Sequence, residues 1–234
     1  MKLYCFNVGA IDEPMSGIVI PIYAYLIEHP KGRILVDTGE SYELRDENAV
    51  MEEKDTILCK LEELGYTPDD IDYVVISHLH QDHAGYLSSF PNAVFIVRRE
   101  EMMYAWWPEP CKLGYDFRAY EKTHDFNYIQ LDPEEEYDVF LDGTVVLIDT
   151  RGHSRGHQSV IVDLPKTGRI VLAMDAVPNK EILDRGFSGR PSADVWQETR
   201  SIRKIKQLEE QGCRILFAHD PDNTPEKEYP LYFE

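Results

Sequence analysis

Basic side chains and cysteines are scarce in this chain of 234 residues, and it contains no long hydrophobic run. Lysine and arginine together number 24 against 43 aspartates and glutamates, which leaves a formal net charge of −19. Nucleic acids and anionic membranes are bound through basic patches, so we expect neither as a partner. No apolar run reaches the ~18 residues that a membrane-spanning helix needs. The amino terminus meets acidic residues before any long apolar segment, which argues against a signal peptide.

The few cysteines lie far apart in the sequence and form no Cys-x-x-Cys pair. They are Cys5, Cys59, Cys111 and Cys213. This spacing favours reduced and mostly buried thiols over a disulfide framework. Together with the missing leader peptide and membrane span, it predicts a cytoplasmic protein.

Apolar segments alternate with turn signals along the whole chain, without a linker, a low-complexity tract or a short repeat. Residues 21–29 and 33–39 flank a Pro-Lys-Gly turn and predict a β-hairpin. Residues 51–65 place apolar side chains on one helical face and end in glycine, which predicts a helix. Further strands are predicted over 73–76, 92–100, 168–175 and 213–219 and at both ends of 144–164, and further helices over 100–107 and 192–212.

This order of elements predicts an α/β fold in which two β-sheets pack face to face with helices outside. Neither half of the chain looks able to bury its own sheet, so we expect one domain over residues 1–234. Residues 108–137 are rich in aromatic and acidic side chains and are predicted to form an irregular surface excursion. The aromatic segment 102–107, "MMYAWW", is expected in the core rather than in a ligand pocket.

Side chains of the types that bind metals cluster in the segment "VVISHLHQDHAGYL", residues 74–87, although the whole chain has only 8 histidines. More of them directly follow later apolar runs. The full set is His78, His80, Asp82, His83, His153, Asp175 and His219. Each lies at the carboxyl end of a predicted strand, and strand ends at one edge of a sheet can converge on a single cleft. Imidazoles and carboxylates together favour a transition metal such as zinc, with iron, manganese or cobalt as alternatives.

The spacing within the cluster indicates two cations rather than one. In an extended loop His78 and His80 point to the same side, whereas Asp82 and His83 follow after the chain has turned. Seven ligands are too many for one tetrahedral ion. They suit two metals roughly 3.5–4 Å apart that share a bridging carboxylate and a bridging water.

The segment "HLHQDH", followed by separate His, Asp and His, resembles the HxHxDH signature of the metallo-β-lactamase superfamily. The segment "ILVDTG", residues 34–39, is similar to the second motif of that superfamily. The stretches "GYTPDDIDYVVISHLHQDHAG", "RGHSRGHQS" and "FAHD" resemble the N-acyl-homoserine lactone lactonases, its quorum-quenching branch. The resemblance runs from "PIYAYLIE" to the carboxyl terminus. It implies a four-layer αββα sandwich.

The resemblance also implies a role for each residue of the cluster. It assigns three histidines to a first metal, namely His78, His80 and His153. It assigns three residues to a second metal, namely Asp82, His83 and His219. Asp175 would bridge the two ions, Asp37 would orient a ligand from behind, and His157 would be a supporting histidine rather than a ligand. A glutamate at the position of His80 would have indicated a flavodiiron protein.

The implied activity is the opening of a lactone ring. A hydroxide that bridges two divalent ions would attack the ester carbonyl, and Asp82 would carry a proton to the leaving alkoxide. The expected partner is a small lactone or ester, and the expected assembly is a monomer or a homodimer. The chain departs from the lactonase pattern at two substrate-facing positions: Pro178 stands where a tyrosine is usual, and Gln81 where a bulky apolar residue is usual. Tyr23 or Tyr104 could supply the missing hydroxyl.

Two other classes of function compete with the lactonase interpretation. A hydrolase of the same fold could cleave a thioester, as glyoxalase II does, or a phosphodiester, as ribonuclease Z does. The first carries an additional helical domain after the last ligand, where this chain ends about fifteen residues later. The second needs basic substrate contacts, which the acidic composition does not favour. A non-catalytic relic is disfavoured because all seven ligand positions are kept.

Overall fold

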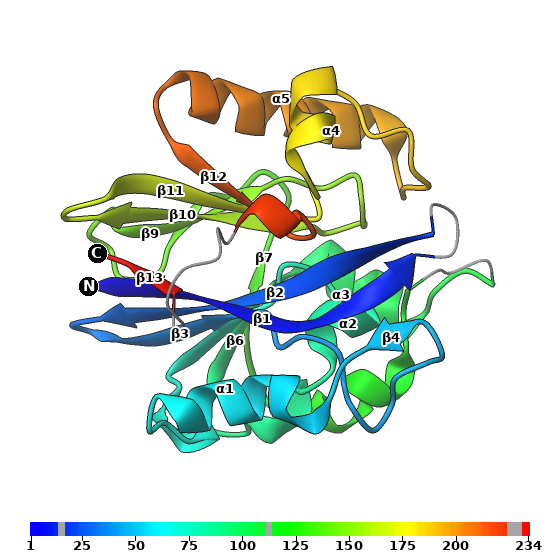
Figure 1. The fold of residues 1–234 in the computed structure, drawn as a ribbon, viewed down its shortest axis with the longest axis vertical. Coiled ribbons are helices and arrows are strands. Elements are labelled where there is room, and N and C mark those ends of the chain that lie inside the picture. Colours follow the sequence, from blue (N-terminus) through cyan, green and yellow to red (C-terminus); the bar gives the residue numbers. More distant parts are fainter. Residues whose placement is uncertain (14–16, 111–113, 224–230) are drawn as a thin grey trace.

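The computed structural model describes residues 1–13, 17–110, 114–223 and 231–234, and of Glu13 and Leu231 only the backbone. Within these residues the strands form two β-sheets (Figure 1). The larger sheet has the order β13 (Leu231–Phe233), β1 (Lys2–Glu13), β2 (Ile18–His29), β3 (Gly32–Val36), β5 (Tyr73–Val75), β6 (Val94–Arg98) and β7 (Asn127–Leu131), and β4 (Ala49–Val50) pairs with β1. From β3 to β7 the neighbouring strands run parallel, so helices or long loops connect them.

The smaller sheet comes almost entirely from the second half of the chain. Its order is β12 (Arg214–Phe217), β11 (Gly168–Met174), β10 (Gln158–Leu164), β9 (Val145–Asp149) and β8 (Tyr137–Asp138). The pair β11–β12 is parallel, and the pairs β9–β10 and β10–β11 are antiparallel. Strands β9, β11 and β12 therefore point in the same direction, and their carboxyl ends lie at one edge of the sheet.

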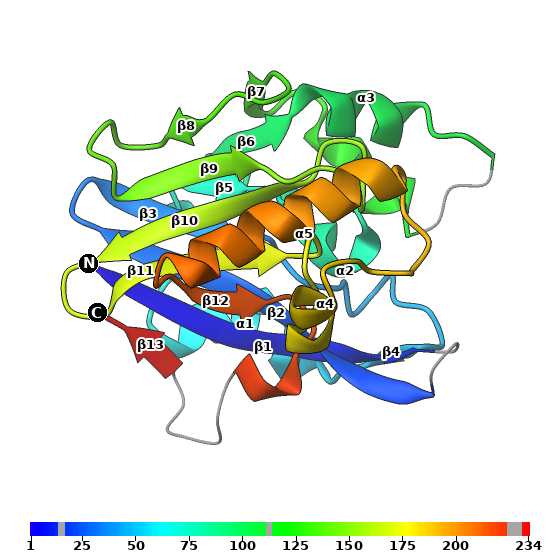
Figure 2. The ribbon, with the colours of Figure 1, turned by 90° about the horizontal axis from the view of Figure 1, so that it is seen from above.

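Helices cover the outer face of each sheet, which completes the predicted αββα sandwich (Figures 1 and 2). Helices α1 (Ile57–Glu63), α2 (Gln81–Ala84) and α3 (Arg99–Trp106) lie on the side of the larger sheet. Helices α4 (Lys180–Arg185) and α5 (Val195–Glu210) cover the smaller sheet. Short 3₁₀ turns connect the elements at Glu53–Asp55, Pro68–Asp70, Leu87–Ser89, Phe117–Ala119, Glu121–Thr123 and Pro221–Asn223.

The two faces of β2 explain why its sequence is apolar without alternation. Ala24 and Leu26 pack toward the helices of the larger sheet, whereas Tyr25 and Ile27 pack between the two sheets. A strand that is buried on both faces requires apolar side chains at every position. The core between the sheets is completed from the smaller sheet by residues such as Leu172, so that the two sheets hold each other in place.

The termini of α1 and α5 are set by side-chain caps. The helix predicted over 51–65 begins only at Ile57, because the Thr56 hydroxyl accepts a hydrogen bond from the Cys59 amide (3.4 Å). The helix predicted over 192–212 begins at Val195, where Asp194 accepts hydrogen bonds from the amides of residues 196 and 197. Both helices were predicted correctly, and the start of α1 was predicted too early. For α5 the sequence offers Ser192 or Asp194 as the N-cap, and the structure selects Asp194.

The prediction of an irregular excursion over residues 108–137 was wrong in part. Strand β7 lies within it and pairs in parallel with β6 along five residue pairs, from Val94–Asn127 to Arg98–Leu131. Its side chains are mostly half-buried or exposed, as expected for an edge strand. The polar, turn-rich sequence did not indicate this strand, which is stabilised by pairing with β6 and by the packing of Tyr128, Ile129 and Leu131 against the core. The short helix α4 was not predicted either.

Three of the cysteines can be examined in the structure. Cys5 and Cys213 are buried, Cys59 is half-buried, and all three are free thiols. These three agree with the predicted reduced state, and Cys111 lies outside the described residues. No helix in the described part of the chain combines the length and apolar character that crossing a bilayer requires.

The core between the sheets should tolerate truncation poorly. Leu172 is fully buried there, whereas Leu141 is 87% exposed. We expect Leu172→Ala to lower the free energy of unfolding by about 2–5 kcal/mol, because it removes buried methyl groups and leaves a cavity. The same substitution at Leu141 should change it by less than about 0.5 kcal/mol. Urea denaturation of both variants measures this, and equal losses would contradict the assigned core.

Candidate metal centre

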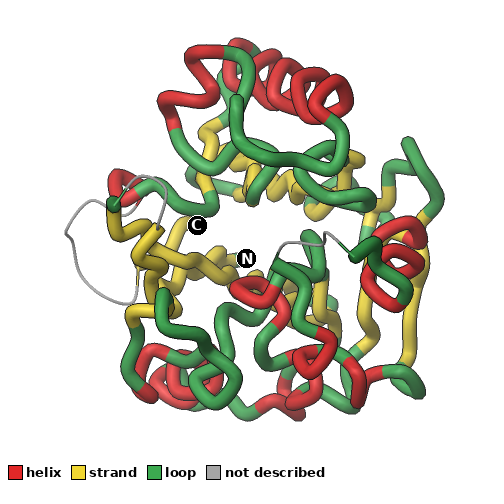
Figure 3. Tube along the Cα trace, turned by 90° about the vertical axis from the view of Figure 1, so that its right-hand side faces the viewer, coloured by secondary structure: helices red, strands yellow, loops and turns green. Residues whose placement is uncertain are grey.

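Every residue of the predicted cluster lies at one place between the two sheets. His78 and His80 follow β5 of the larger sheet, and Asp82 and His83 belong to α2, which comes directly after them. His153, Asp175 and His219 follow β9, β11 and β12 of the smaller sheet. Figure 3 views the molecule from its right-hand side in Figure 1, where loops join the strands of both layers. The sandwich thus brings together residues up to 141 positions apart, since 219 − 78 = 141.

Six of these side chains form two triplets, each with its ligand-type atoms within 4.8 Å of one another. One triplet is His78, His80 and His153, and the other is Asp82, His83 and His219. In the first, His153 Nε2 lies 3.1 Å from His80 Nδ1. In the second, His83 Nε2 lies 3.3 Å from Asp82 Oδ2. A third triplet, Asp37, His78 and His83, takes one histidine from each of these two, so the two groups lie side by side. The two groups that the resemblance implies are thus both present in the geometry, and their binding of metal stays a prediction.

Asp175 lies between the triplets and turns one carboxylate oxygen toward each. Its Oδ1 is 3.1 Å from His83 Nε2 and 3.2 Å from His219 Nε2. Its Oδ2 is 3.3 Å from His153 Nε2. A carboxylate in this position can contact two cations at once, one through each oxygen.

Two of the imidazoles are held from behind, and several nitrogens and oxygens of the site are left without a hydrogen bond. His83 Nδ1 lies 2.7 Å from Asp37 Oδ2, and His219 Nδ1 donates to the carbonyl oxygen of Pro21 at 2.8 Å. By contrast, His78 Nε2, His83 Nε2 and Asp175 Oδ1 are buried without a hydrogen-bond partner. Buried polar atoms normally have partners. Close contacts without hydrogen-bond geometry are expected of ligands that converge on a common cation, so this donor set fits a metal site.

The electrostatics favour the metal-binding protonation state at His78, His153 and Asp175, whereas His83 holds a proton. Burial holds the pKa of His78 and His153 well below the usual imidazole range, so both rings are neutral. Burial opposes ionisation of Asp175, but the surrounding histidines, His219 first, lower its pKa well below the usual carboxyl range. Burial also disfavours a charged His83, yet Asp82 and Asp175 raise its pKa well above the usual value. A metal that binds here must therefore displace a proton.

Asp37 in the segment "ILVDTG" is fully buried and ties the two strand ends of the larger sheet to the site. Its Oδ1 accepts from the amide of Ser77 (2.7 Å), and its Oδ2 accepts from the Ser77 hydroxyl (2.5 Å). Asp37 has a φ of 59°, a conformation that non-glycine residues adopt rarely and mostly at functional positions. The contact with His83 Nδ1 fixes the orientation of the His83 ring. The sequence predicts that Asp37 orients a metal ligand from behind, and that role in metal binding stays a prediction.

Glu101 of α3 is a positioning residue that sequence reasoning missed. It is fully buried, and its carboxylate accepts four hydrogen bonds. Oε1 accepts from the Leu79 amide (2.9 Å) and the Tyr115 hydroxyl (2.8 Å). Oε2 accepts from the Ser154 hydroxyl and the Gly156 amide, both at 2.8 Å. One carboxylate thereby joins the loop of His78 and His80 to the loop of His153. Nothing in the local sequence distinguishes it from Glu100.

His157 is fully buried beside the first triplet but belongs to neither group. Its Nδ1 lies 2.9 Å from the hydroxyl oxygen of Thr150, and its ring centroid is 5.2 Å from that of His78. Burial lowers the pKa of His157 to about 3, so the ring is neutral at physiological pH. This placement agrees with the choice of His153 over His157 as the candidate ligand.

The two positions that depart from the lactonase pattern differ in their surroundings. Pro178 is buried, and its carbonyl oxygen accepts from the amide of His219 (2.9 Å), so it supports the strand end but offers no donor. Gln81 lines a cavity of about 240 Å³ next to Asp82, and its Nε2 lies 3.5 Å from Asp46 Oδ2. Of the two proposed substitutes for the missing hydroxyl, Tyr23 is only 1% exposed in the core between the sheets.

A cleft leads from the first triplet to the surface. It has a volume of about 190 Å³ and is lined by His80, Tyr104, Glu109, Tyr115, His153, Ser154, Arg155 and residues 191–193. Tyr104 therefore faces the cleft, whereas Met103 and Trp107 of the same helical segment are exposed, at 62% and 82%. The expectation that "MMYAWW" belongs to the core holds for Ala105 and in part for Met102, Tyr104 and Trp106, which pack against the core. It fails for Met103 and Trp107, because successive side chains of a helix point in different directions.

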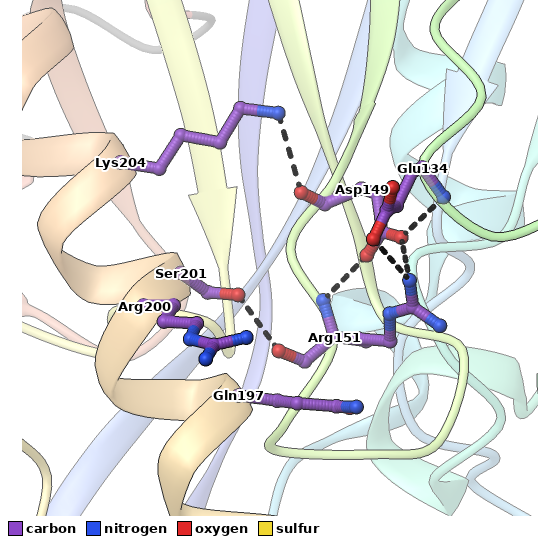
Figure 4. A pocket seen from close by; sticks show the side chains of 7 residues that line it. All are labelled: Glu134, Asp149, Arg151, Gln197, Arg200, Ser201 and Lys204. Carbon is purple, nitrogen blue, oxygen red and sulfur yellow. Dashed lines mark hydrogen bonds and ion pairs between the residues drawn. The ribbon is translucent and has the colours of Figure 1, made fainter.

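A separate cavity of about 200 Å³ lies between α5 and the loop after β9 (Figure 4). It is lined by Glu134, Asp149, Arg151, Gln197, Arg200, Ser201 and Lys204. Arg151 forms ion pairs with Asp149 (3.0 Å) and Glu134 (3.7 Å), and Ser201 donates to the Arg151 carbonyl oxygen (2.7 Å). These contacts neutralise most of the charge in the cavity and attach α5 to the loop that carries His153.

Fold and site together define a metal-dependent hydrolase class, and the chain belongs to it: the model of the metallo-beta-lactamase superfamily matches residues 17–211. Within that class the chain is 33% identical to the N-acyl homoserine lactonase AttM of Azorhizobium caulinodans, over 100% of this chain and 99% of that protein. It is also 33% identical to the N-acyl homoserine lactonase AiiA of Bacillus thuringiensis subsp. kurstaki, over 92% and 87%.

A solved structure agrees with these sequence matches. It shows an N-acyl homoserine lactone hydrolase with the product N-hexanoyl-L-homoserine bound at its catalytic metal centre. It matches this chain with a TM-score of 0.85 at 29% identity and covers 99% of this chain and 98% of the other. The resemblance predicted from the HxHxDH motif is thereby confirmed, as is the α/β sandwich.

The four hydrogen bonds of Glu101 make it a sensitive test of how the site is assembled. Glu101→Gln replaces one acceptor oxygen by an amide donor, so that two donors lose their partner. We expect the free energy of unfolding to fall by at least about 2 kcal/mol, at roughly 1–3 kcal/mol for each unsatisfied group. Glu100→Gln is the matched control, because Glu100 is half-exposed and pairs only with Arg151 (3.0 Å). Chemical denaturation of both variants checks this, and similar losses would argue against the assigned role.

Proposed function

We propose that this protein is a dinuclear-metal hydrolase that opens the ring of an N-acyl-homoserine lactone or a related lactone. The observation that carries the proposal is the position of Asp175, which turns one oxygen toward each triplet at 3.1–3.3 Å. The names of the full-length relatives support the choice of a lactone as substrate. In the solved structure with a bound product, the product lies at the catalytic metal centre, which supports a substrate site next to the candidate metal ligands of this chain.

In this proposal the first ion would be held by His78, His80 and His153, and the second by Asp82, His83 and His219, and Asp175 would be a ligand of both. Imidazole and carboxylate donors suit zinc, and the same set accepts iron, manganese or cobalt. When bound, two divalent ions would supply a deprotonated water near neutral pH and polarise the ester carbonyl. Asp37 would keep the His83 ring in the orientation that ligation needs.

The remaining steps depend on residues of the chain. The cleft beside His80 and His153 would hold the lactone with its carbonyl carbon next to the two triplets. Attack forms a new carbon–oxygen bond and breaks the ring carbon–oxygen bond, so the leaving alkoxide must gain a proton. In our proposal Asp82 takes the proton that remains on the attacking hydroxide once it has added to the carbonyl and delivers it to the leaving alkoxide. Its Oδ2 lies within the second triplet, 3.3 Å from His83 Nε2 and 3.6 Å from His219 Nε2.

A phosphodiester is the second candidate substrate. The observation in its favour is that Arg155 lines the cleft and Arg190 reaches the cluster, so the site is less acidic than the average charge suggests. Against it, Arg155 is already paired with Glu109 (3.7 Å) and lies over the ring of Tyr104. We also propose a cytoplasmic location, supported by the free thiols, and a monomer or homodimer as the working assembly.

Removing the metal should destabilise the protein. Without cations, the inner atoms of His78, His83 and Asp175 are buried and unpaired. Metal present at about a hundredfold excess over its Kd adds about 2.7 kcal/mol to the free energy of unfolding. For a protein of this size each kcal/mol shifts the Tm by about 2–4 °C, so a chelator should lower the Tm by roughly 5–10 °C. Calorimetry with and without dipicolinate measures this, and an unchanged Tm in metal-loaded protein would contradict a structural contribution of the ions.

Loss of the shared carboxylate should abolish activity. We expect wild-type protein to hold close to two metals per chain and to open N-hexanoyl-homoserine lactone. Asp175→Ala should lose metal, and its kcat/KM should fall by at least about a thousandfold. Asp163→Ala is the control, because Asp163 is a half-exposed aspartate on β10 that pairs with Arg169 (3.2 Å). Metal analysis and a pH-indicator assay of ring opening provide the measurements.

The same assay separates the alternatives. Turnover of a thioester or a phosphodiester without lactone opening would keep the metal chemistry and replace the substrate. Two bound metals with no turnover of any ester would indicate a non-catalytic protein. Wild-type protein without metal would contradict the proposal as a whole.

A further inference from the structure

We propose that Arg190 binds the carboxyl group that ring opening creates, and so acts as a specificity-determining contact on the side of the lactone carbonyl. This inference rests on the proposed function, because it assigns a partner to a side chain of the same site. Neither the HxHxDH motif nor the ligand set includes Arg190, which lies in the segment between α4 and α5.

Arg190 reaches the cluster from the side of the first triplet. Its Nη2 lies 3.6 Å from Asp175 Oδ2, the oxygen that also faces His153. Its side chain keeps 37% of its surface exposed, so it sits at the mouth of the site and not within the core. The next residues, 191–193, line the cleft that opens beside His80 and His153. A guanidinium has five N–H donors, and this single long contact leaves others available to a bound molecule.

The segment that carries Arg190 is fixed on both sides of it. The amide of Arg190 donates to the Ser188 hydroxyl (3.2 Å). The amides of Ala193 and Asp194 donate to the carbonyl oxygens of His153 (3.1 Å) and Gly152 (2.9 Å). The loop of the candidate ligand His153 and the loop of Arg190 are therefore joined by backbone hydrogen bonds. Because the backbone of this segment is already ordered, little backbone entropy is lost when Arg190 binds a ligand.

The chemistry of ring opening explains why a permanent cation is useful at this position. Water adds across the ester bond of a neutral lactone, the ring oxygen leaves with a proton, and the new acid releases a proton to become a carboxylate. Negative charge thus appears on the acyl oxygens only as the reaction proceeds. A guanidinium interacts more strongly with these charged oxygens than with the neutral carbonyl, so it stabilises the transition state and the product over the substrate.

Other donors are poorly placed for this contact. Pro178 has no N–H, and its carbonyl oxygen is occupied by the amide of His219. Tyr23 is buried between the sheets. Tyr104 lines the cleft together with Arg155, whose guanidinium carbon lies 5.5 Å from the centre of its ring. Arg190 precedes the cleft-lining residues 191–193, and its guanidinium contacts the Asp175 oxygen that faces His153 of the first triplet.

Arg190 could instead serve only to orient Asp175, and the two roles predict different results. A single partly exposed ion pair at 3.6 Å contributes little to stability. An orienting role would make an Arg190 variant lose metal and stability. A carboxyl-binding role would leave both unchanged and weaken the binding of the charged product.

The experiment compares wild type, Arg190→Gln and Arg190→Lys in metal-loaded protein, with Arg169→Gln as the control. Arg169 is half-exposed and pairs singly with Asp163 (3.2 Å), far from the cleft. Titration calorimetry with ring-opened N-hexanoyl-homoserine measures product affinity, and kinetics with the lactone separate kcat from KM. For Arg190→Gln we expect product affinity and kcat to fall by roughly ten- to hundredfold, the range for a hydrogen bond to a charged group. KM and metal content should change little, and Arg190→Lys should recover part of the loss.

The outcomes distinguish this inference from the proposed function. If wild type opens the lactone but Arg190→Gln binds product as tightly as wild type, the assignment of Arg190 is overturned and the lactonase function stands. If Arg190→Gln loses metal as well as product affinity, the residue orients Asp175 and the carboxyl-binding role is overturned. If wild type opens no lactone, the proposed function fails and this inference fails with it.

Discussion

The burial of two carboxylates and five imidazoles at one point between two sheets is the constraint on which the rest of the structure depends. Burying ionised or polar side chains is unfavourable unless each atom finds a partner. The outer nitrogens of His83 and His219 find theirs in Asp37 and the carbonyl of Pro21. By contrast, His78 Nε2, His83 Nε2 and Asp175 Oδ1 have no hydrogen-bond partner within the described residues. In our proposal two cations complete the site, so that folding and metal binding favour each other.

Close backbone contacts make this convergence possible, and glycine is required where they are tightest. A Cβ on Gly85 would come within 2.2 Å of the Ser41 amide, and one on Gly152 within 2.0 Å of the Glu198 amide. The first contact presses α2 against the loop after β3. The second presses the loop of His153 against α5. Helices on both outer faces therefore support the loops at the strand ends, which explains how short loops hold ligand-type side chains at defined distances.

The metal-type ligands follow strands, whereas part of the cleft beside them is lined by Tyr104 of α3 and by residues 191–193 between α4 and α5. In our proposal these cleft residues meet the substrate, so they can change while the ligands are kept, which is how one fold serves many substrates. Pro178, which stands where the lactonase pattern has a tyrosine, is such a change in the loop after β11. In our proposal Arg190 supplies a positive charge where the carboxylate forms, and Tyr104 supplies an aromatic wall of the cleft.

The sequence by itself determined which side chains could bind metal, the hairpin of β2 and β3, most of the strands, and the sandwich implied by the family motif. These properties are local, because side-chain type, spacing and apolar period can be read within a few residues. Only the tertiary structure decided the pairing of β7 with β6, the four partners of Glu101 and the position of Arg190 beside Asp175. Glu101 contacts residues 22 and 55 positions away, and such partners are set by the packing of both sheets. No local pattern records that packing, since Glu100 and Glu101 are neighbours of the same type and only one faces the interior.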